Sequence, residues 1–175
     1  ALPIFWYGGV LRPLVGSVDS FYTAYSAFNS LNPADTNYWD EADRYFDQVS
    51  YVDYIIGQSW MGNTDWPNNN IKLYRSNKTS FRWRFGLIDQ ELAMAPNGWT
   101  DCFFDAINYL LGQDPGNPFI NVWLQGIQNG RFKNYFINRY ADVMNTSYKS
   151  ARLLAIENDI FNQVNAEMPN EFARW

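Results

Sequence analysis

The chain of 175 residues contains no histidine and only one cysteine. Histidine is the usual base of Ser-His-Asp and Cys-His hydrolases and a frequent zinc ligand, so its absence excludes these sites. The single Cys102 excludes an internal disulfide, and its place in an apolar pattern indicates a buried structural thiol. Any chemistry must therefore rely on carboxylates, amides, Lys, Arg, Tyr or a bound metal.

Long apolar runs and an excess of positive charge are also lacking. No run approaches the roughly 18 apolar residues that a membrane helix needs, so we expect no membrane span. The net charge of −5 argues against a nucleic-acid partner, whose phosphates require clustered basic residues. Three arginines do cluster near residue 80, and we expect them to be solvated: Arg75, Arg82 and Arg84.

Length and patterning predict one domain over residues 1–175. Most segments with regular apolar spacing follow the helical period, and only two short runs are typical of strands. A chain of this length can bury a sizeable core, and aromatic residues make up 19% of it. We therefore expect a mainly α-helical fold with a small β-hairpin, in the α+β class.

The most informative segment is Asn63–Asn70, with the sequence NTDWPNNN, because a hairpin is predicted directly after it. Residues 71–75 and 81–85 are typical of two short strands, and the polar residues between them are typical of a turn. A hairpin returns the chain to its starting point. Asn70, before the first strand, and Asp89, after the second, are therefore predicted to meet near Asp65.

The interval Asp65-x₄-Asn70 is that of the protein-kinase catalytic loop, where the Asp orients the acceptor hydroxyl and the Asn holds a metal. Oxygen ligands of this kind suit Mg²⁺ or Mn²⁺ carrying a phosphate. Both residues also have an ordinary structural reading, because Asp is common in turns and Asn can cap a strand. The candidates are catalytic Asp65; metal ligands Asn70, Asp89 and Glu91; and supporting Asn63 and Asn69.

At these motifs the sequence resembles the CotH (spore coat protein H) kinase-like family. The resemblance rests on YVDYIIGQSW at 51–60, GNTDWPNNN at 62–70 and FRWRFGLID at 81–89, and on the segments 129–140 and 167–175. It spans roughly residues 17–175. It implies the large lobe of an atypical kinase fold. It also implies an enzyme of the spore coat, of the cell surface or secreted, that uses ATP and a divalent metal to phosphorylate Ser or Thr of a coat or surface protein.

The chain departs from the family pattern in two respects. Family members carry an Asp-x-Asp pair at the metal site, whereas here the pair is Asp89 and Glu91. The family's small nucleotide-binding lobe lies upstream of the matched region, Gly8-Gly9 is too short for a phosphate loop, and all four lysines follow Asn70. We therefore expect a large lobe without its small lobe, inactive alone, whose exposed lobe surface meets either that lobe or a second copy.

Two other functions fit the sequence. A carbohydrate-binding or carbohydrate-active surface domain would use Asp65 and Asp89 as its carboxylate pair. Its sugar-stacking platforms would be Trp60, Trp66 and Trp83. A structural coat or surface module would keep the fold without chemistry. The identity of a protein substrate is not indicated by any motif.

Overall fold

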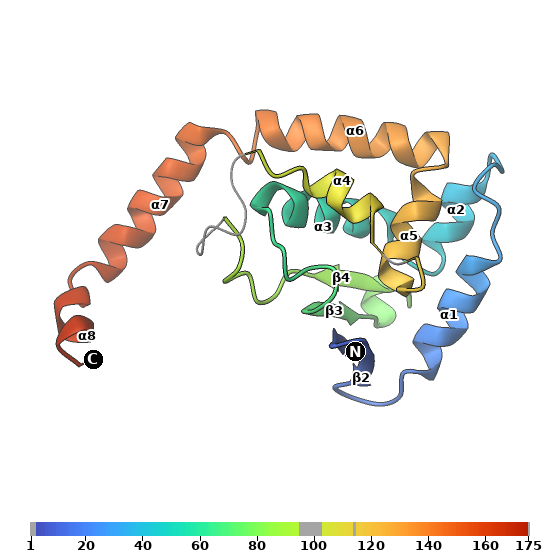
Figure 1. Ribbon diagram of the computed structural model, residues 1–175, viewed down its shortest axis with the longest axis horizontal. Coiled ribbons are helices and arrows are strands. Elements are labelled where there is room, and N and C mark those ends of the chain that lie inside the picture. Colours follow the sequence, from blue (N-terminus) through green and yellow to red (C-terminus); the bar gives the residue numbers. More distant parts are fainter. Residues whose placement is uncertain (1–2, 95–102, 114, 175) are drawn as a thin grey trace. The chain divides into compact units, whose positions relative to one another are not determined.

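The computed structural model describes residues 3–94, 103–113 and 115–174 of the chain (Figure 1). The chain forms two compact units, Ala1–Phe136 and Ile137–Trp175. The described part of the first unit contains a four-stranded sheet and several helices, which confirms the predicted mainly α-helical class with a small sheet. All residues of the candidate site lie in this unit.

The sheet is antiparallel, with the strand order β2-β1-β3-β4. Its strands are β1 (Ile4–Tyr7), β2 (Val10–Pro13), β3 (Ile71–Tyr74) and β4 (Arg84–Gly86). Alternate side chains face the core, as the period of a strand requires, and these are Ile4, Leu11, Ile71, Leu73 and Phe85. The hairpin predicted after Asn70 is thus β3 and β4, in which Leu73 lies opposite Phe85.

The β1–β2 hairpin was not among the elements expected from the sequence. Gly8 and Gly9 form its turn with φ of +56° and +78°, a backbone region that favours glycine. These two glycines are therefore turn residues. Through β1 the hairpin adds two strands to the edge of β3, and Trp6 lies opposite Ile71 beside the candidate loop.

The helices of the first unit enclose an aromatic core. They are α1 (Asp19–Asn29), α2 (Tyr38–Asp43), α3 (Gln48–Met61), α4 (Ala106–Leu111), α5 (Pro118–Gly126) and the start of α6 (Gly130–Asn145). The Phe21 ring centroid lies 5.9 Å from that of Phe46, 5.8 Å from Trp83 and 5.4 Å from Phe119. Aromatic contacts of this kind join α1, α5 and the residues just before α3 and β4 into one core.

Helix α3 positions the candidate loop. It begins where the Asp47 side chain accepts a hydrogen bond from the Ser50 N–H, as its sequence predicts. It ends at Gly62, whose φ of 60° lets the chain leave the helix directly into residues 63–70. Most α3 residues are buried and the helix packs against β4, so the loop starts from a fixed element.

Helix α4 begins at Ala106. Asp105 caps it by accepting a hydrogen bond from the Asn108 N–H at 2.9 Å, while Thr100 and Cys102 lie outside the described residues. Pro118 starts α5 after a cap by Asn117, at the first-turn position that proline favours.

The second unit contains the end of α6, α7 (Ser150–Val164) and α8 (Met168–Arg174). Neither α7 nor the described part of α8 has a buried residue, although the spacing of apolar residues in α7 is helical. Among the described helices of both units, none combines the length and apolar character of a membrane span.

Candidate functional site

The loop of residues 63–70 holds the Asp65 carboxylate between two amides. Asn69 Nδ2 donates to Asp65 Oδ1 at 2.8 Å, and Asn70 Nδ2 donates to Asp65 Oδ2 at 2.6 Å. Each carboxylate oxygen retains further acceptor capacity, because a carboxylate accepts about four hydrogen bonds. The structure thus brings three of the predicted site residues into direct contact and fixes the plane of the carboxylate.

The β1–β2 hairpin contacts the same loop. The Gly8 N–H donates to Asn69 Oδ1 at 2.9 Å, and Trp6 Nε1 donates to the Asn68 carbonyl at 3.0 Å. Asn69 therefore links the hairpin turn to Asp65 through its two ends. Local spacing in the sequence could not indicate the contact of Asn69 with the hairpin turn.

A chain of three amides connects the loop to the segment after β4. Asn63 Nδ2 donates to Gln58 Oε1 at 3.0 Å and lies 3.4 Å from Gln90 Oε1, while Asn63 Oδ1 accepts from the Asp65 N–H at 3.2 Å. Asn63 and Gln58 are buried, so these hydrogen bonds matter for the loop. The sequence does not predict the contact of Gln90 with Asn63, because no motif distinguishes a glutamine between two acids.

The carboxyl groups of Asp89 and Glu91 interact with each other. The pKa of Glu91 lies above its ordinary value, first because its side chain is hydrogen-bonded to Asp89 and then because of the charges of Asp89 and, more weakly, Asp65. The pair thus lies within electrostatic reach of Asp65. Asp89 has a φ of 51° and Asn70 one of 56°, a left-handed conformation that Asp and Asn tolerate better than most residues.

This donor set fits a hard cation that also binds phosphate. Two adjacent carboxylates repel each other, and a bound divalent cation would offset that repulsion, so Asp89 and Glu91 are the acids that would hold it. The Asn70 Nδ2 donates to Asp65, so Oδ1 is the atom of this side chain that a cation would bind. Across residues 3–94, 103–113 and 115–174, however, no three His, Cys, Asp or Glu side chains gather as metal ligands. Mg²⁺ commonly completes such a site with phosphate and water.

Tyr109 of α4 lies within reach of the Asp65 charge. Its pKa is raised, first by burial and then by the charge of Asp65. Next to α4, Asn68 Nδ2 lies 3.5 Å from Gln113 Oε1, and Asn117 Nδ2 donates to the Pro67 carbonyl at 3.3 Å. The loop of residues 63–70 is thus held by the hairpin, by Gln90 and by the segment between α4 and α5.

Two of the tryptophans considered as sugar platforms are core residues. Trp66 is 3% exposed and Trp83 is fully buried, so neither ring can stack on a ligand at the surface. Trp83 packs against Phe21, and Trp66 lies 6.0 Å from the Tyr54 ring. These contacts remove the main structural support for a carbohydrate site around the loop.

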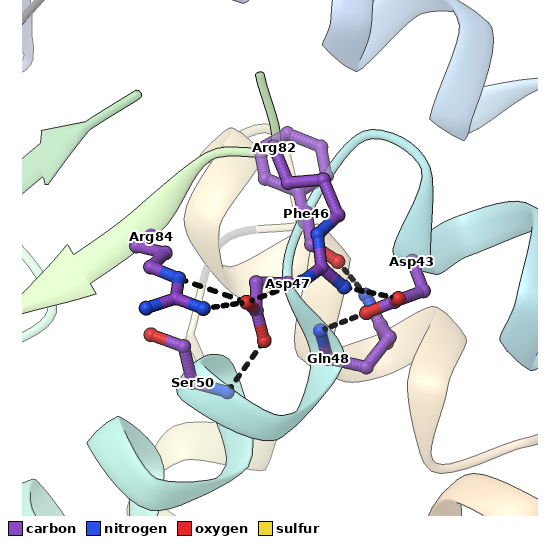
Figure 2. A network of polar contacts seen from close by, with 7 residues as sticks. All are labelled: Asp43, Phe46, Asp47, Gln48, Ser50, Arg82 and Arg84. Atoms are coloured by element: carbon purple, nitrogen blue, oxygen red, sulfur yellow. Dashed lines mark hydrogen bonds and ion pairs between the residues drawn. The ribbon is translucent and has the colours of Figure 1, made fainter. Parts of the chain in front are cut away.

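A partly buried ion-pair network joins the start of α3 to the segment around β4 (Figure 2). Asp47, at the start of α3, accepts from Arg84 Nε at 2.8 Å and lies 2.8 Å from Arg84 Nη2 and 3.2 Å from Arg82 Nη2. Arg82 also pairs with Asp43, which accepts from the Gln48 N–H at 2.9 Å. The expectation that Arg82 and Arg84 are simply solvated was wrong, because both tie β4 to α2 and α3.

One comparison with known proteins identifies the family of the chain. No curated protein and no solved structure shows significant similarity to the chain. A protein-family model described as CotH kinase protein matches residues 17–175, which include the loop, the β3–β4 hairpin and the carboxylate pair. Because this match covers most of its length, the chain belongs to the CotH kinase family.

Proposed function

We propose that the chain supplies the acceptor-orienting and metal-binding part of a kinase that transfers phosphate from ATP to a Ser or Thr hydroxyl of a protein. The observation that supports this most is the placement of Asp65. Two amides from its own loop orient its carboxylate, and the Asp89–Glu91 pair lies within reach of its charge. Kinases need this combination, because phosphoryl transfer depends on positioning and charge neutralisation.

Asp65 accepts a hydrogen bond from the acceptor hydroxyl and orients it toward the phosphate. Asn69 and Asn70 hold the carboxylate in place, and the Asn63–Gln90 contact keeps the loop against the segment that carries Asp89. The chain's role in the reaction is therefore to fix the angle between acceptor and phosphate.

The metal ligands in this proposal are Asn70, Asp89 and Glu91. Mg²⁺ or Mn²⁺, when bound, neutralises charge on the transferring phosphoryl group. Glu91 is one methylene longer than the Asp usual in the family, and the raised pKa of Glu91, caused first by a hydrogen bond to Asp89, supports a site that the two acids share. Membership of the family suggests association with the spore coat, and we propose a coat or surface protein as the substrate.

The test is transfer of labelled γ-phosphate from Mg–ATP or Mn–ATP by the gene product that contains these residues. Asp65→Asn is expected to reduce transfer by about 10²–10⁴-fold, the usual contribution of a positioned acid–base group. Asp40→Asn is the matched control, because Asp40 is exposed and pairs with Arg131 away from the loop. Transfer at the wild-type rate by the Asp65 variant would make Asp65 a turn residue only.

A further inference from the structure

The face of the sheet that points away from the core differs in composition from the rest of the chain. Because side chains alternate along a strand, the residues between the core positions point to this outer face. All of them are exposed or half-buried, and they are Phe5, Tyr7, Val10, Arg12, Lys72, Tyr74, Arg84 and Gly86. No carboxylate is among these eight residues, although the whole chain carries a net charge of −5. The outer face is thus a basic and aromatic surface on an acidic protein.

One row of residues on the outer face runs through all four strands. Arg12 lies opposite Phe5, and Phe5 lies opposite Lys72. Lys72 in turn lies opposite Gly86. Residues directly opposite each other in an antiparallel pair have Cβ atoms about 5 Å apart. Lys72 therefore has an aromatic ring on one side and a residue without a side chain on the other. A Cβ on Gly86 would meet nothing closer than the Lys72 carbonyl at 3.9 Å, so the surface beside Lys72 is open.

The two cations of this row are not used by the chain itself. Neither the Arg12 nor the Lys72 side chain forms an ion pair or a hydrogen bond with residues 3–94, 103–113 or 115–174. Arg84 on the same face differs, because it is paired with Asp47. Lysine binds phosphate as a point charge, and an aromatic ring stacks on a nucleic-acid base. The row therefore favours a ligand that has both an anionic group and a flat group.

The row also lies next to the proposed metal ligands. Asn70 directly precedes β3, and Lys72 is the first residue of β3 on the outer face. Two residues along a strand cover about 7 Å. β4 ends at Gly86, opposite Lys72, and the chain continues from there to Asp89. Lys72 is thus placed beside the site where Asn70 and Asp89 would hold a metal and its phosphate.

We propose that the outer face binds the nucleoside triphosphate, with Lys72 on a phosphate and the ring of Phe5 against the base. Lys72 then has the role that kinases give to a lysine of the small lobe. The charge of the row and its place beside the metal ligands favour this occupant over a small lobe or a second copy of the chain. That the nucleotide is the phosphate donor rests on the proposed function, whereas its binding to the outer face does not.

The experiment is an amide NMR titration of the 175-residue protein with Mg–ATP. The signals of the row and of its neighbours in β1 and β3 are expected to shift first, with a Kd of about 1 mM. Lys72→Gln is expected to weaken binding about tenfold, because it removes one charge-assisted hydrogen bond. Lys78→Gln is the matched control, because Lys78 is exposed in the turn between β3 and β4 and lies outside the row. Melting curves verify that both variants fold.

Inorganic tripolyphosphate measures the contribution of the base. ATP is expected to bind about tenfold more tightly than tripolyphosphate, the effect of stacking one base on an aromatic ring. Phe5→Leu is expected to remove most of this difference, because it keeps an apolar side chain but loses the ring. Phe161→Leu is the control, because Phe161 is 55% exposed in α7, in the other unit of the chain.

Three results would overturn the proposal. They are no shift in the row at about 10 mM Mg–ATP, the same effect from Lys72→Gln as from Lys78→Gln, and equal affinity for ATP and tripolyphosphate. A dimer in sedimentation, without shifts on adding ATP, would assign the outer face to a second copy and reject the proposal as well.

Phosphate transfer by the gene product separates this proposal from the proposed function. Transfer that Lys72→Gln leaves unchanged would reject the nucleotide site on the outer face and leave the kinase proposal standing. Binding of ATP to the outer face without any transfer would do the reverse.

Discussion

Replacing Asp47 by alanine is expected to lower the free energy of unfolding by about 3 kcal/mol. The Asp47 side chain is 4% exposed, whereas those of its partners Arg82 and Arg84 are 27% and 37% exposed. Breaking a fully buried pair costs about 3–5 kcal/mol, and access of water to both arginines lowers this to about 2 kcal/mol. Loss of the helix cap at the Ser50 N–H adds about 1 kcal/mol.

Urea unfolding followed by tryptophan fluorescence measures this change. Asp47→Asn keeps an acceptor for the cap and the arginines but loses the charge, so about half the effect is expected. Asp40→Ala is the control, because its ion pair with Arg131 is 63% and 54% exposed and contributes less than about 1 kcal/mol. If Asp47→Ala were as stable as Asp40→Ala, the network in Figure 2 would not hold β4 against α3.

The Asp89–Glu91 pair and two helical glycines give further tests. Because the pKa of Glu91 is raised in the folded state, the contribution of Glu91 to stability is fully present below its ordinary value of 4.5 and is lost as the pH rises through the raised value. Glu91→Gln should remove this contribution, so urea titrations from below pH 4.5 upward should show a smaller fall than in the wild type, and unchanged pH dependence would contradict the carboxylate contact. Gly126→Ala should cost about 1–3 kcal/mol, since its Cβ would lie 2.9 Å from the Phe132 ring. Gly130→Ala has open space and should raise stability by up to about 1 kcal/mol, and a reversed order of the two variants would refute this packing.

The elements that local chemistry determines could be predicted from the sequence. Asp47 and Pro118 begin helices where cap rules place them, and the polar turn after β3 produces the expected hairpin. The β1–β2 hairpin carries a signal too, a Gly-Gly pair between two short apolar runs. The pair is too short for the phosphate loop of a kinase, and it forms the hairpin turn instead.

Contacts across long stretches of sequence could not be predicted in the same way. Arg84 binds an acid 37 positions away, and the Gly8 N–H reaches Asn69 across 61 positions. From the sequence alone, Arg84 fits a solvated strand residue and Gly8 fits an ordinary turn residue. Only the packing of β4 on α3 and the pairing of β1 with β3 bring their partners within reach. The same holds for Gln90, whose amide finds Asn63 through the return of the hairpin.

Paramagnetic broadening by Mn²⁺ in the amide NMR spectrum tests the central claim most directly, because it detects even weak binding at a defined place. The account predicts that Mn²⁺, with or without ATP, broadens the signals of residues 63–70 and 88–91 first, and that Asp89→Ala removes this selectivity. Broadening centred elsewhere, such as around Asp43 and Asp53, or unchanged by Asp89→Ala, would contradict a metal site formed by Asn70, Asp89 and Glu91.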